Sequence, residues 1–180
     1  MAQNKPFEER IALPEGVTGR VEGGVVILKG KAGELKREII GPRVAVEGAE
    51  IVLRTEKGLK KQKKLVMSAK AHIKNMCSGV MAKHVYILKI CSGHFPMTVA
   101  VQKGEFVVKN LYGEKVARTV KVVPGTDVKV DGTAITVESV DKELAGKMAA
   151  NIQQLTRRPG FDTRIFQDGI YITEKSGKKI

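Results

Sequence analysis

The chain of 180 residues carries 32 Lys and Arg against 19 Asp and Glu, and this net charge of +13 favours an anionic partner. Hydrophobic residues make up 42% of the sequence, which is enough for a packed core and excludes a globally disordered chain. No apolar run approaches the roughly 18 to 20 residues that a membrane-spanning helix requires, so we expect no membrane partner.

The N-terminal part of the chain predicts antiparallel strands followed by a helix. Residues 25–29 form an apolar, β-branched run that enters a glycine turn, and residues 44–53 have the pattern of a hairpin turning at Glu47-Gly48. Apolar residues then recur at spacings of three and four: Leu65, Val66, Ala69, Ile73 and Met76. This spacing is typical of one buried helix face, so we expect a small sheet covered by one helix.

A lysine-rich loop is expected just before this helix. Residues 51–92 carry a net charge of +9, whereas residues 1–50 are neutral. The charge peaks in a short run: Lys57, Lys60, Lys61, Lys63 and Lys64. Lysine runs are often only solvated surface, but this concentration of charge favours contact with phosphate groups.

The second half of the chain repeats the first. Residues 106–109 echo residues 25–29, and residues 128–137 align with the hairpin of residues 44–53 at a shift of 84. The apolar helix positions recur at a shift of 79: Leu144, Ala145, Met148, Ile152 and Leu155. Ser139 and Asp141 are candidate N-caps of this second helix.

These patterns predict an α+β fold of two tandem similar domains, each a small antiparallel β-sheet packed with one α-helix. We expect residues 84–90 to form a strand that follows the first helix and ends the first domain. The predicted domains are therefore residues 1–91 and residues 92–180, and the second domain ends in a basic C-terminal extension.

A second group of cations closes the chain. It comprises Arg157, Arg158, Arg164, Lys175, Lys178 and Lys179. The lysines fall in a polar tail, residues 174–180, that need not be ordered on its own. Two basic groups in an otherwise nearly balanced chain favour phosphate binding by both segments.

The sequence contains no pattern for catalysis or for binding a metal or a cofactor. The sequence places none of His72, His84 and His94 for catalysis. Cys77 with His84, or Cys91 with His94, could pair a thiol with a base, but such a pair also needs a third orienting group and a cleft. Cys77 and Cys91 do not have the spacing of zinc ligands. We therefore expect no enzyme activity, no catalytic residues, no metal ion and no cofactor.

The composition favours RNA over DNA as the anionic partner. Aromatic residues make up only 4% of the sequence, without Trp, which argues against base stacking as the main mode of binding. Lysines and arginines on a loop and a tail suit the backbone phosphates of a folded RNA. No recognition-helix or zinc-finger pattern is present for reading DNA. Binding should depend on salt and be weakly sequence-specific.

Four segments together resemble one protein family. They are Leu-Lys-Gly-Lys-Ala-Gly-Glu-Leu at 28–35, Asn-Leu-Tyr-Gly-Glu-Lys at 110–115, His94-Phe95-Pro96, and the ending from Arg157-Arg158-Pro159 to Asp168-Gly169-Ile170-Tyr171. In this order they resemble the universal large-subunit ribosomal protein six family, called protein nine in eukaryotes, over essentially the whole chain. Arg157-Arg158-Pro159 resembles the bacterial branch, whereas His94-Phe95-Pro96 and Asp168-Gly169-Ile170-Tyr171 resemble the eukaryotic and archaeal branch. An archaeal type reconciles the two.

The resemblance implies a structural constituent of the large ribosomal subunit, located in the cytoplasm. Such a protein binds rRNA near the sarcin-ricin loop and the stalk base and supports the factor-binding region during translation. Its partners are large-subunit rRNA, neighbouring ribosomal proteins and the stalk base. In the family, the segment after the second helix supplies the main rRNA contacts, which carries onto Arg157, Arg158 and Arg164, and onto the lysines of the tail.

The sequence departs from bacterial members of the family after Pro159. It has Gly-Phe-Asp-Thr-Arg at residues 160–164, where bacterial members carry a Lys-Gly-rich stretch.

A free-standing, charge-driven module that binds proteins or RNA is the alternative function. Co-sedimentation with large subunits after a salt wash distinguishes this module from a ribosomal protein. An enzyme with a distributed site is a third possibility, for which the sequence offers no convergent cluster of titratable groups.

Overall fold

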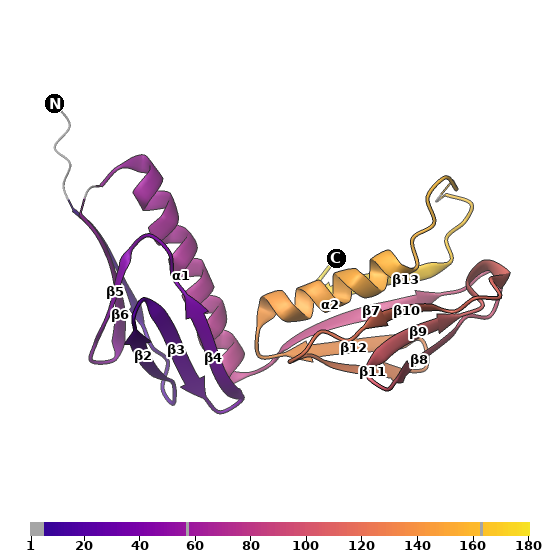
Figure 1. The fold of residues 1–180 in the computed structure, drawn as a ribbon, viewed down its shortest axis with the longest axis horizontal. Helices are drawn as coiled ribbons and strands as arrows, with labels where there is room; N and C mark the ends of the chain where they lie inside the picture. The colour runs from indigo at the N-terminus through magenta and orange to yellow at the C-terminus, as the bar shows by residue number, and fades with distance from the viewer. Residues whose placement is uncertain (1–5, 57, 163) are drawn as a thin grey trace. The chain divides into compact units, whose positions relative to one another are not determined.

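The computed structural model describes residues 6–56, 58–162 and 164–180 of an α+β protein. The chain divides into two units, Met1–Lys83 and His84–Ile180, and both are drawn in Figure 1. Each unit contains antiparallel sheets and one long helix, as the sequence predicts. Within the described ranges, no helix combines the length and the hydropathy that a membrane crossing needs.

In its described residues, 6–56 and 58–83, the first unit contains two three-stranded antiparallel sheets and one helix. Its elements are β1 (Phe7–Ala12), β2 (Thr18–Glu22), β3 (Val25–Gly30), β4 (Gly33–Glu38), β5 (Arg43–Glu47), β6 (Glu50–Thr55) and α1 (Lys60–Met81). The strand orders are β1-β6-β5 and β2-β3-β4. The hairpin predicted for residues 44–53 is formed by β5 and β6, in which Val46 pairs with Ile51.

Helix α1 contacts strands of both sheets and completes the core of this unit (Figure 1). The predicted apolar stripe is its buried face, which includes Val66, Ile73 and Met76. Leu28 on β3 and Leu53 on β6 are fully buried. Removing these apolar side chains from water is the main driving force for packing the helix on the strands.

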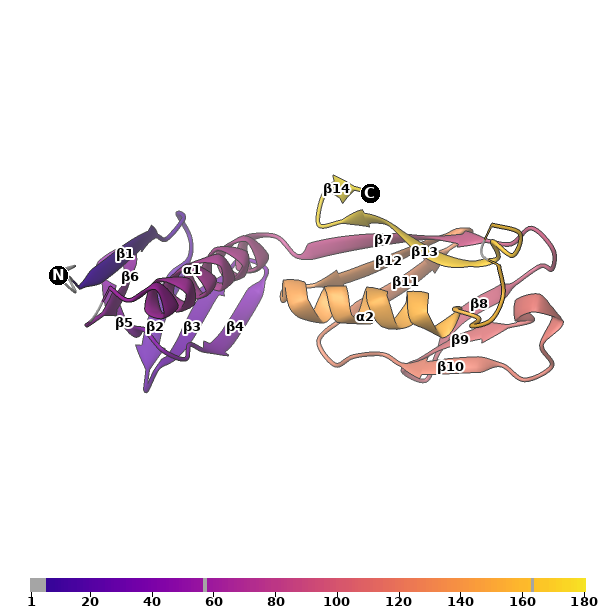
Figure 2. The same cartoon turned by 90° about the horizontal axis from the view of Figure 1, so that it is seen from above.

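The second unit has the same plan with additional strands. Its elements are β7 (His84–Cys91), β8 (Thr98–Gln102), β9 (Glu105–Lys109), η1 (Leu111–Gly113), β10 (Arg118–Lys121), β11 (Asp127–Asp131), β12 (Ala134–Ser139), α2 (Lys142–Leu155), β13 (Gly169–Lys175) and β14 (Lys178–Lys179). The strand orders are β10-β9-β8 and β11-β12-β7-β13-β14 (Figure 2). Met148 and Ile152 of α2 are fully buried in one cluster with Leu88 of β7. As predicted, Asp141 caps α2 and accepts a hydrogen bond from the Glu143 N–H at 2.8 Å.

Strand pairing confirms the internal repeat. Strand β6 lies between β1 and β5, as β12 lies between β7 and β11. Ile11 pairs with Ile51 in the first unit, and Leu88 pairs with Ile135 in the second. Ile51 and Ile135 are the positions related by the shift of 84 residues. Among the strands described, β13 and β14 belong to the second unit alone, where β13 extends the sheet beyond β7.

The boundary between the units differs from the one expected from the sequence. It falls between Lys83 and His84, so β7 begins the second unit instead of ending a first domain of residues 1–91. The physical reason is that β7 pairs with β12 on one side and β13 on the other. A strand belongs to the sheet that satisfies its backbone hydrogen bonds, and both neighbours of β7 come from later in the chain.

Gly30 provides a test of the contact between β3 and the C-terminal turn of α1. A Cβ atom at this position would lie 2.6 Å from the carbonyl oxygen of Val80, which also accepts a hydrogen bond from the Ala32 N–H at 2.7 Å. Because the obstacle is backbone, we expect Gly30→Ala to lower the free energy of unfolding by about 1–3 kcal/mol in urea denaturation. The exposed neighbour supplies a control, since Lys31→Ala should unfold like the wild type. Equal stability of Gly30→Ala and wild type would contradict this close approach.

Candidate functional site

The C-terminal end of α2 is held by Arg118 on β10. The guanidinium of Arg118 donates hydrogen bonds to the carbonyl oxygens of Leu155 at 2.8 Å and Arg157 at 3.1 Å. Carbonyls at the end of a helix lack intrahelical partners, so Arg118 satisfies groups that would otherwise need water. Glu114 accepts two hydrogen bonds from Arg118, at 2.6 and 2.8 Å, which lower the pKa of Glu114 and raise the pKa of Arg118. The backbone at Arg157 is thereby fixed.

Thr156 and Gln153 connect the same helix end to β13. The Thr156 hydroxyl donates to the carbonyl oxygen of Gln153 at 3.1 Å and accepts a hydrogen bond from the Ile170 N–H at 3.0 Å. The Gln153 Oε1 atom accepts a hydrogen bond from the Ile172 N–H at 3.2 Å. This second contact occupies the carbonyl end of the Gln153 amide, which leaves its NH₂ group as a donor.

A buried carboxylate fastens the segment after α2 to the residues that follow β7. Asp168 is 5% exposed and accepts hydrogen bonds from the Gly93 N–H at 2.7 Å, and from the His94 N–H and Nδ1 at 3.1 Å each. Burial alone would raise the pKa of Asp168, but these hydrogen bonds outweigh it and hold the pKa below its ordinary value. The Tyr112 hydroxyl donates to the Asp168 carbonyl oxygen at 3.0 Å. Burial, together with the Asp168 charge, raises the pKa of Tyr112.

Aromatic rings gather beside Asp168. The ring of Phe166 lies 4.9 Å from Phe161, 5.9 Å from His94 and 6.0 Å from Tyr112, measured between centroids. The guanidinium carbon of Arg158 lies 3.9 Å from the ring centroid of Phe161 and 5.3 Å from that of Tyr112. A guanidinium over a ring face is attracted by the negative face of the ring, so Arg158 helps to order this segment.

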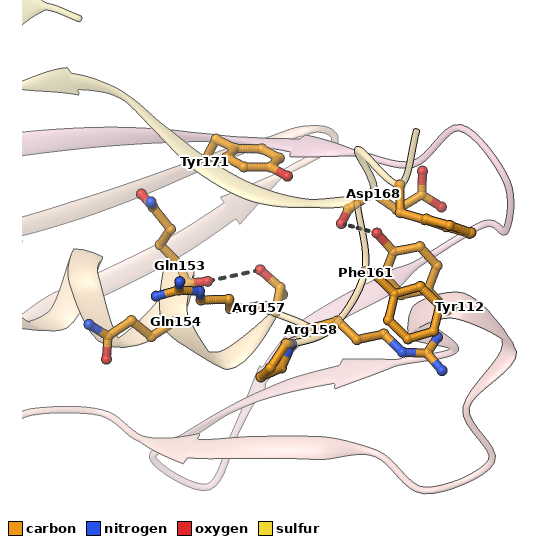
Figure 3. A pocket seen from close by; sticks show the side chains of 12 residues that line it. Tyr112, Gln153, Gln154, Arg157, Arg158, Phe161, Asp168 and Tyr171 are labelled. Atoms are coloured by element: carbon orange, nitrogen blue, oxygen red, sulfur yellow. Dashed lines mark hydrogen bonds between the residues drawn. The ribbon is translucent and has the colours of Figure 1, made fainter. Parts of the chain in front are cut away.

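Several of these residues line a cleft of about 400 Å³, shown in Figure 3. Its lining consists of Tyr112, Gln153, Gln154, Thr156, Arg157, Arg158, Pro159, Gly160, Phe161, Phe166, Asp168 and Tyr171. The Arg157 side chain extends back along the end of α2, whereas the Arg158 side chain extends the opposite way, toward Tyr112. The lining thus combines cations, aromatic rings and carboxamides, a composition suited to an anionic ligand with a flat ring.

The structure brings together two of the three predicted arginines. Arg157 is exposed, and its side chain has no ion-pair partner among the residues that the structure describes. Arg164 lies outside the cleft lining, with its side chain 89% exposed. Its guanidinium makes two bonds to Asp162, at 2.8 and 3.1 Å, which lower the pKa of Asp162. The charge of Arg164 is therefore partly neutralised within its own turn.

The three tail lysines lie on a β-hairpin, whereas the sequence suggested a tail that need not be ordered. Strand β13 extends to Lys175, which pairs with Lys178, and β14 consists of Lys178 and Lys179. All three are exposed and lie outside the cleft lining. The hairpin presents three cations on an ordered backbone.

Four lysines of the first basic group lie on α1 and not in the loop before it: Lys60, Lys61, Lys63 and Lys64. Lys57 lies outside the described residues. Leu59 occupies the N-cap position without a capping side chain, and the first turn holds no acidic residue. The sequence analysis did not predict a helix start at Lys60, because no Ser, Thr, Asp or Asn lies at the N-cap position before it. The four lysines therefore lie at the N-terminal end of α1, where the helix dipole is already positive.

Sequence reasoning missed the aromatic and carboxamide part of the cleft. The low overall aromatic content argued against stacking, yet Phe161, Phe166 and Tyr171 fall within one short stretch beside the paired arginines. The local clustering of aromatic residues next to Arg157 and Arg158 was therefore the sequence signal that could have revealed the cleft. Tyr112 and Gln153 had no such signal, because only the fold brings η1 and α2 to this end of the second unit.

Comparison with known proteins finds a family that matches most of the chain. The sequence model described as Ribosomal protein L6 matches residues 13–83 and 95–169, one segment in each unit. The large ribosomal subunit protein uL6 of Methanococcus vannielii is 42% identical over 174 residues, covering 96% of each chain. That of Methanobrevibacter smithii is 41% identical over 171 residues, covering 94% of this chain and 96% of the relative.

Asp168 should control the stability of the cleft in a pH-dependent way. Since its pKa is lowered on folding, the ionised form stabilises the protein above the ordinary aspartate pKa of about 3.9, and this contribution is lost as the pH falls through the lowered value. At pH 7 we expect Asp168→Asn to lower the free energy of unfolding by about 1–3 kcal/mol. Urea denaturation of the variant and the wild type from pH 7 to pH 3 should show the two stabilities converging in acid.

The control for this experiment is Asp162→Asn. Asp162 also has a lowered pKa, but its carboxylate is exposed and pairs only within its own turn. The control should unfold like the wild type at pH 7 because solvent screens an exposed pair. A stability of Asp168→Asn that matches the wild type across this pH range would show that the buried carboxylate does not hold the segment.

Proposed function

The chain belongs to the ribosomal protein L6 family of large ribosomal subunit proteins, and we propose that within the subunit it binds rRNA through the end of its second unit. As a member of this family it is a structural protein and not an enzyme. We place the contact near the sarcin-ricin loop and the stalk base, where the protein supports the factor-binding region during translation. This position rests on the resemblance to the family.

The observation that carries the proposal is the presentation of Arg157. Its guanidinium has no anionic partner among the described residues, while its backbone is held by Arg118. A cation on a braced backbone loses little conformational freedom when it binds a phosphate. Arginine also matches the oxygens of phosphate with two donors in a fixed fork. Arg157 is therefore the best candidate for a defined phosphate contact.

The tail hairpin and Arg164 extend this contact surface. Lys175, Lys178 and Lys179 are exposed and lack acidic partners among the described residues, so each can approach a phosphate. Arg164 contributes less, because a phosphate must compete with Asp162 for its guanidinium. Lys178 and Lys179 are consecutive on a strand, so their side chains point to opposite faces and reach different phosphates.

The lysines at the start of α1 form a second candidate contact, to rRNA or to a neighbouring large-subunit protein. Lys60, Lys61 and Lys64 have no ion-pair partner in the described part of the chain, and Lys63 lies 5.3 Å from the ring centroid of Phe7. Like charges beside the positive end of a helix repel one another in the free protein. An anion at this position would relieve that repulsion.

A titration against salt tests the Arg157 contact. The probe is a large-subunit rRNA fragment that carries the sarcin-ricin region, bound by the full chain at several salt concentrations. Arg157→Ala should weaken binding and reduce the slope of log K against log salt by about 0.7–0.9, the value for one lost phosphate contact. Lys129→Ala, at an exposed lysine on β11, should leave the slope unchanged. An unchanged slope in the Arg157 variant would remove this residue from the interface.

Sedimentation with large subunits tests the alternative function, a free-standing binding module. A large-subunit protein should sediment with large subunits after a salt wash, whereas a module held by charge alone should be released. Equal affinity for the fragment and for an unrelated RNA of the same length would favour the module.

The lysines of α1 are tested by the triple variant Lys60→Ala, Lys61→Ala and Lys64→Ala. If all three contact phosphates, the salt slope should fall by about 2–3. The thermal stability of the free protein should stay equal or rise, because repulsion at the positive end of the helix is removed. A variant that binds with the wild-type slope and enters large subunits normally would show that these lysines face solvent.

A further inference from the structure

We propose that the cleft at the end of α2 holds one unpaired RNA nucleotide, with its base against Tyr171, its edge at the Gln153 amide and its phosphate at Arg157. The inference rests on the proposed binding of rRNA and adds a base-specific element to it. Contacts to backbone phosphates need only exposed cations, whereas this cleft also offers an aromatic surface and fixed hydrogen-bond donors.

The size of the cleft suits a single nucleotide. Its volume of about 400 Å³ lies near the lower end of the roughly 300–1,000 Å³ that small-molecule sites occupy. A paired base inside a duplex cannot enter such a space, whereas a base displaced from its helix can. Proteins that recognise RNA sequence commonly read bases that have been displaced in this way.

Tyr171 supplies the free aromatic surface. Its side chain is 40% exposed and lines the cleft from β13 (Figure 3). Phe161 also lines the cleft, but Arg158 covers its face and Phe166 packs against it. No ring or cation stacks on Tyr171 among the described residues. Tyr171 is therefore the ring on which a base can stack.

Gln153 supplies a donor whose orientation is fixed. Its Oε1 atom accepts the hydrogen bond from the Ile172 N–H at 3.2 Å, so the NH₂ group is the free end of the amide. A donor in this place suits the O4 carbonyl of uracil or the O6 carbonyl of guanine, because cytosine and adenine carry an amino group at the corresponding position. The proposal therefore includes a preference among the four bases.

The charge in the cleft is positive where the ligand would lie. Among the described lining residues, Asp168 is the acidic one. Its Oδ1 atom accepts hydrogen bonds from the Gly93 N–H and from His94 Nδ1, and its Oδ2 atom accepts one from the His94 N–H. Those bonds offset its negative charge locally. Arg157 and Arg158 remain to attract the phosphate that accompanies the base. Because Thr156 and Asp168 already hold the segment in place, binding orders little additional chain.

The experiment compares five RNA duplexes bound by the full chain at one salt concentration. One duplex is fully paired, and the other four carry a single bulged A, C, G or U at the same place. We expect the bulged U or G duplex to bind about 5- to 100-fold more tightly than the paired duplex, the range for one stacked base. Tyr171→Ala should abolish this preference and leave binding to the paired duplex unchanged.

Two control variants separate stacking from a general loss of structure. Tyr171→Phe keeps the ring and should keep the preference. Phe95→Ala removes a ring that is 48% exposed in the same unit but outside the cleft lining, and it should also keep the preference. Circular dichroism and urea denaturation of Tyr171→Ala should stay close to the wild type, because Tyr171 is 40% exposed and lies outside the buried core of the unit.

The outcomes distinguish this inference from the proposed function. If no bulged duplex binds more tightly than the paired one, or if Tyr171→Ala keeps the preference, the nucleotide site is overturned. An Arg157-dependent salt slope on the rRNA fragment would still leave the phosphate contact standing in that case. Failure of the wild-type protein to bind the rRNA fragment would count against the proposed function itself.

Discussion

The hydrogen bonds accepted by the buried Asp168 carboxylate hold the candidate site together. They join the residues after β7 to the segment after α2, and the carbonyl of the same residue receives the Tyr112 hydroxyl. Three parts of the second unit that are distant in sequence therefore meet at one residue. A buried carboxylate that lost these donors would be costly, so the network favours one arrangement of the segment. Arg157 and the aromatic rings are presented in that arrangement.

The two units share one plan, and the second unit adds a cleft to it. Both contain a strand between two others, β6 in the first and β12 in the second, with one helix against the strands. The second unit adds β13 beside β7, and the chain between α2 and β13 forms much of the cleft. The first unit carries its excess charge at the start of α1 instead. Similar frameworks thus present cations on different elements.

Much of the fold was predictable because its signals are local. The Glu47-Gly48 turn marks the β5–β6 hairpin, spacings of three and four mark the buried faces of both helices, and Asp141 marks the start of α2. The partners of β7 were not predictable, because pairing across the sheet leaves no mark beside the strand. The start of α1 at Lys60 was missed for want of a capping residue. In the candidate site, the clustering of positive charge pointed to Arg157 and Arg158. The cleft also depends on Tyr112 and Gln153, which only the fold brings close to these arginines.

The pairing of β7 with β13 also has a consequence for the order in which the protein folds during its own synthesis. All elements of the first unit are present once α1 has been made, so this unit can fold while the rest of the chain is still being translated. The second unit must wait for its last strands, because β7 gains one of its two neighbours only when residues near the C-terminus emerge. Such non-local pairing slows folding. The end of the second unit that carries the cleft is therefore completed after the first unit.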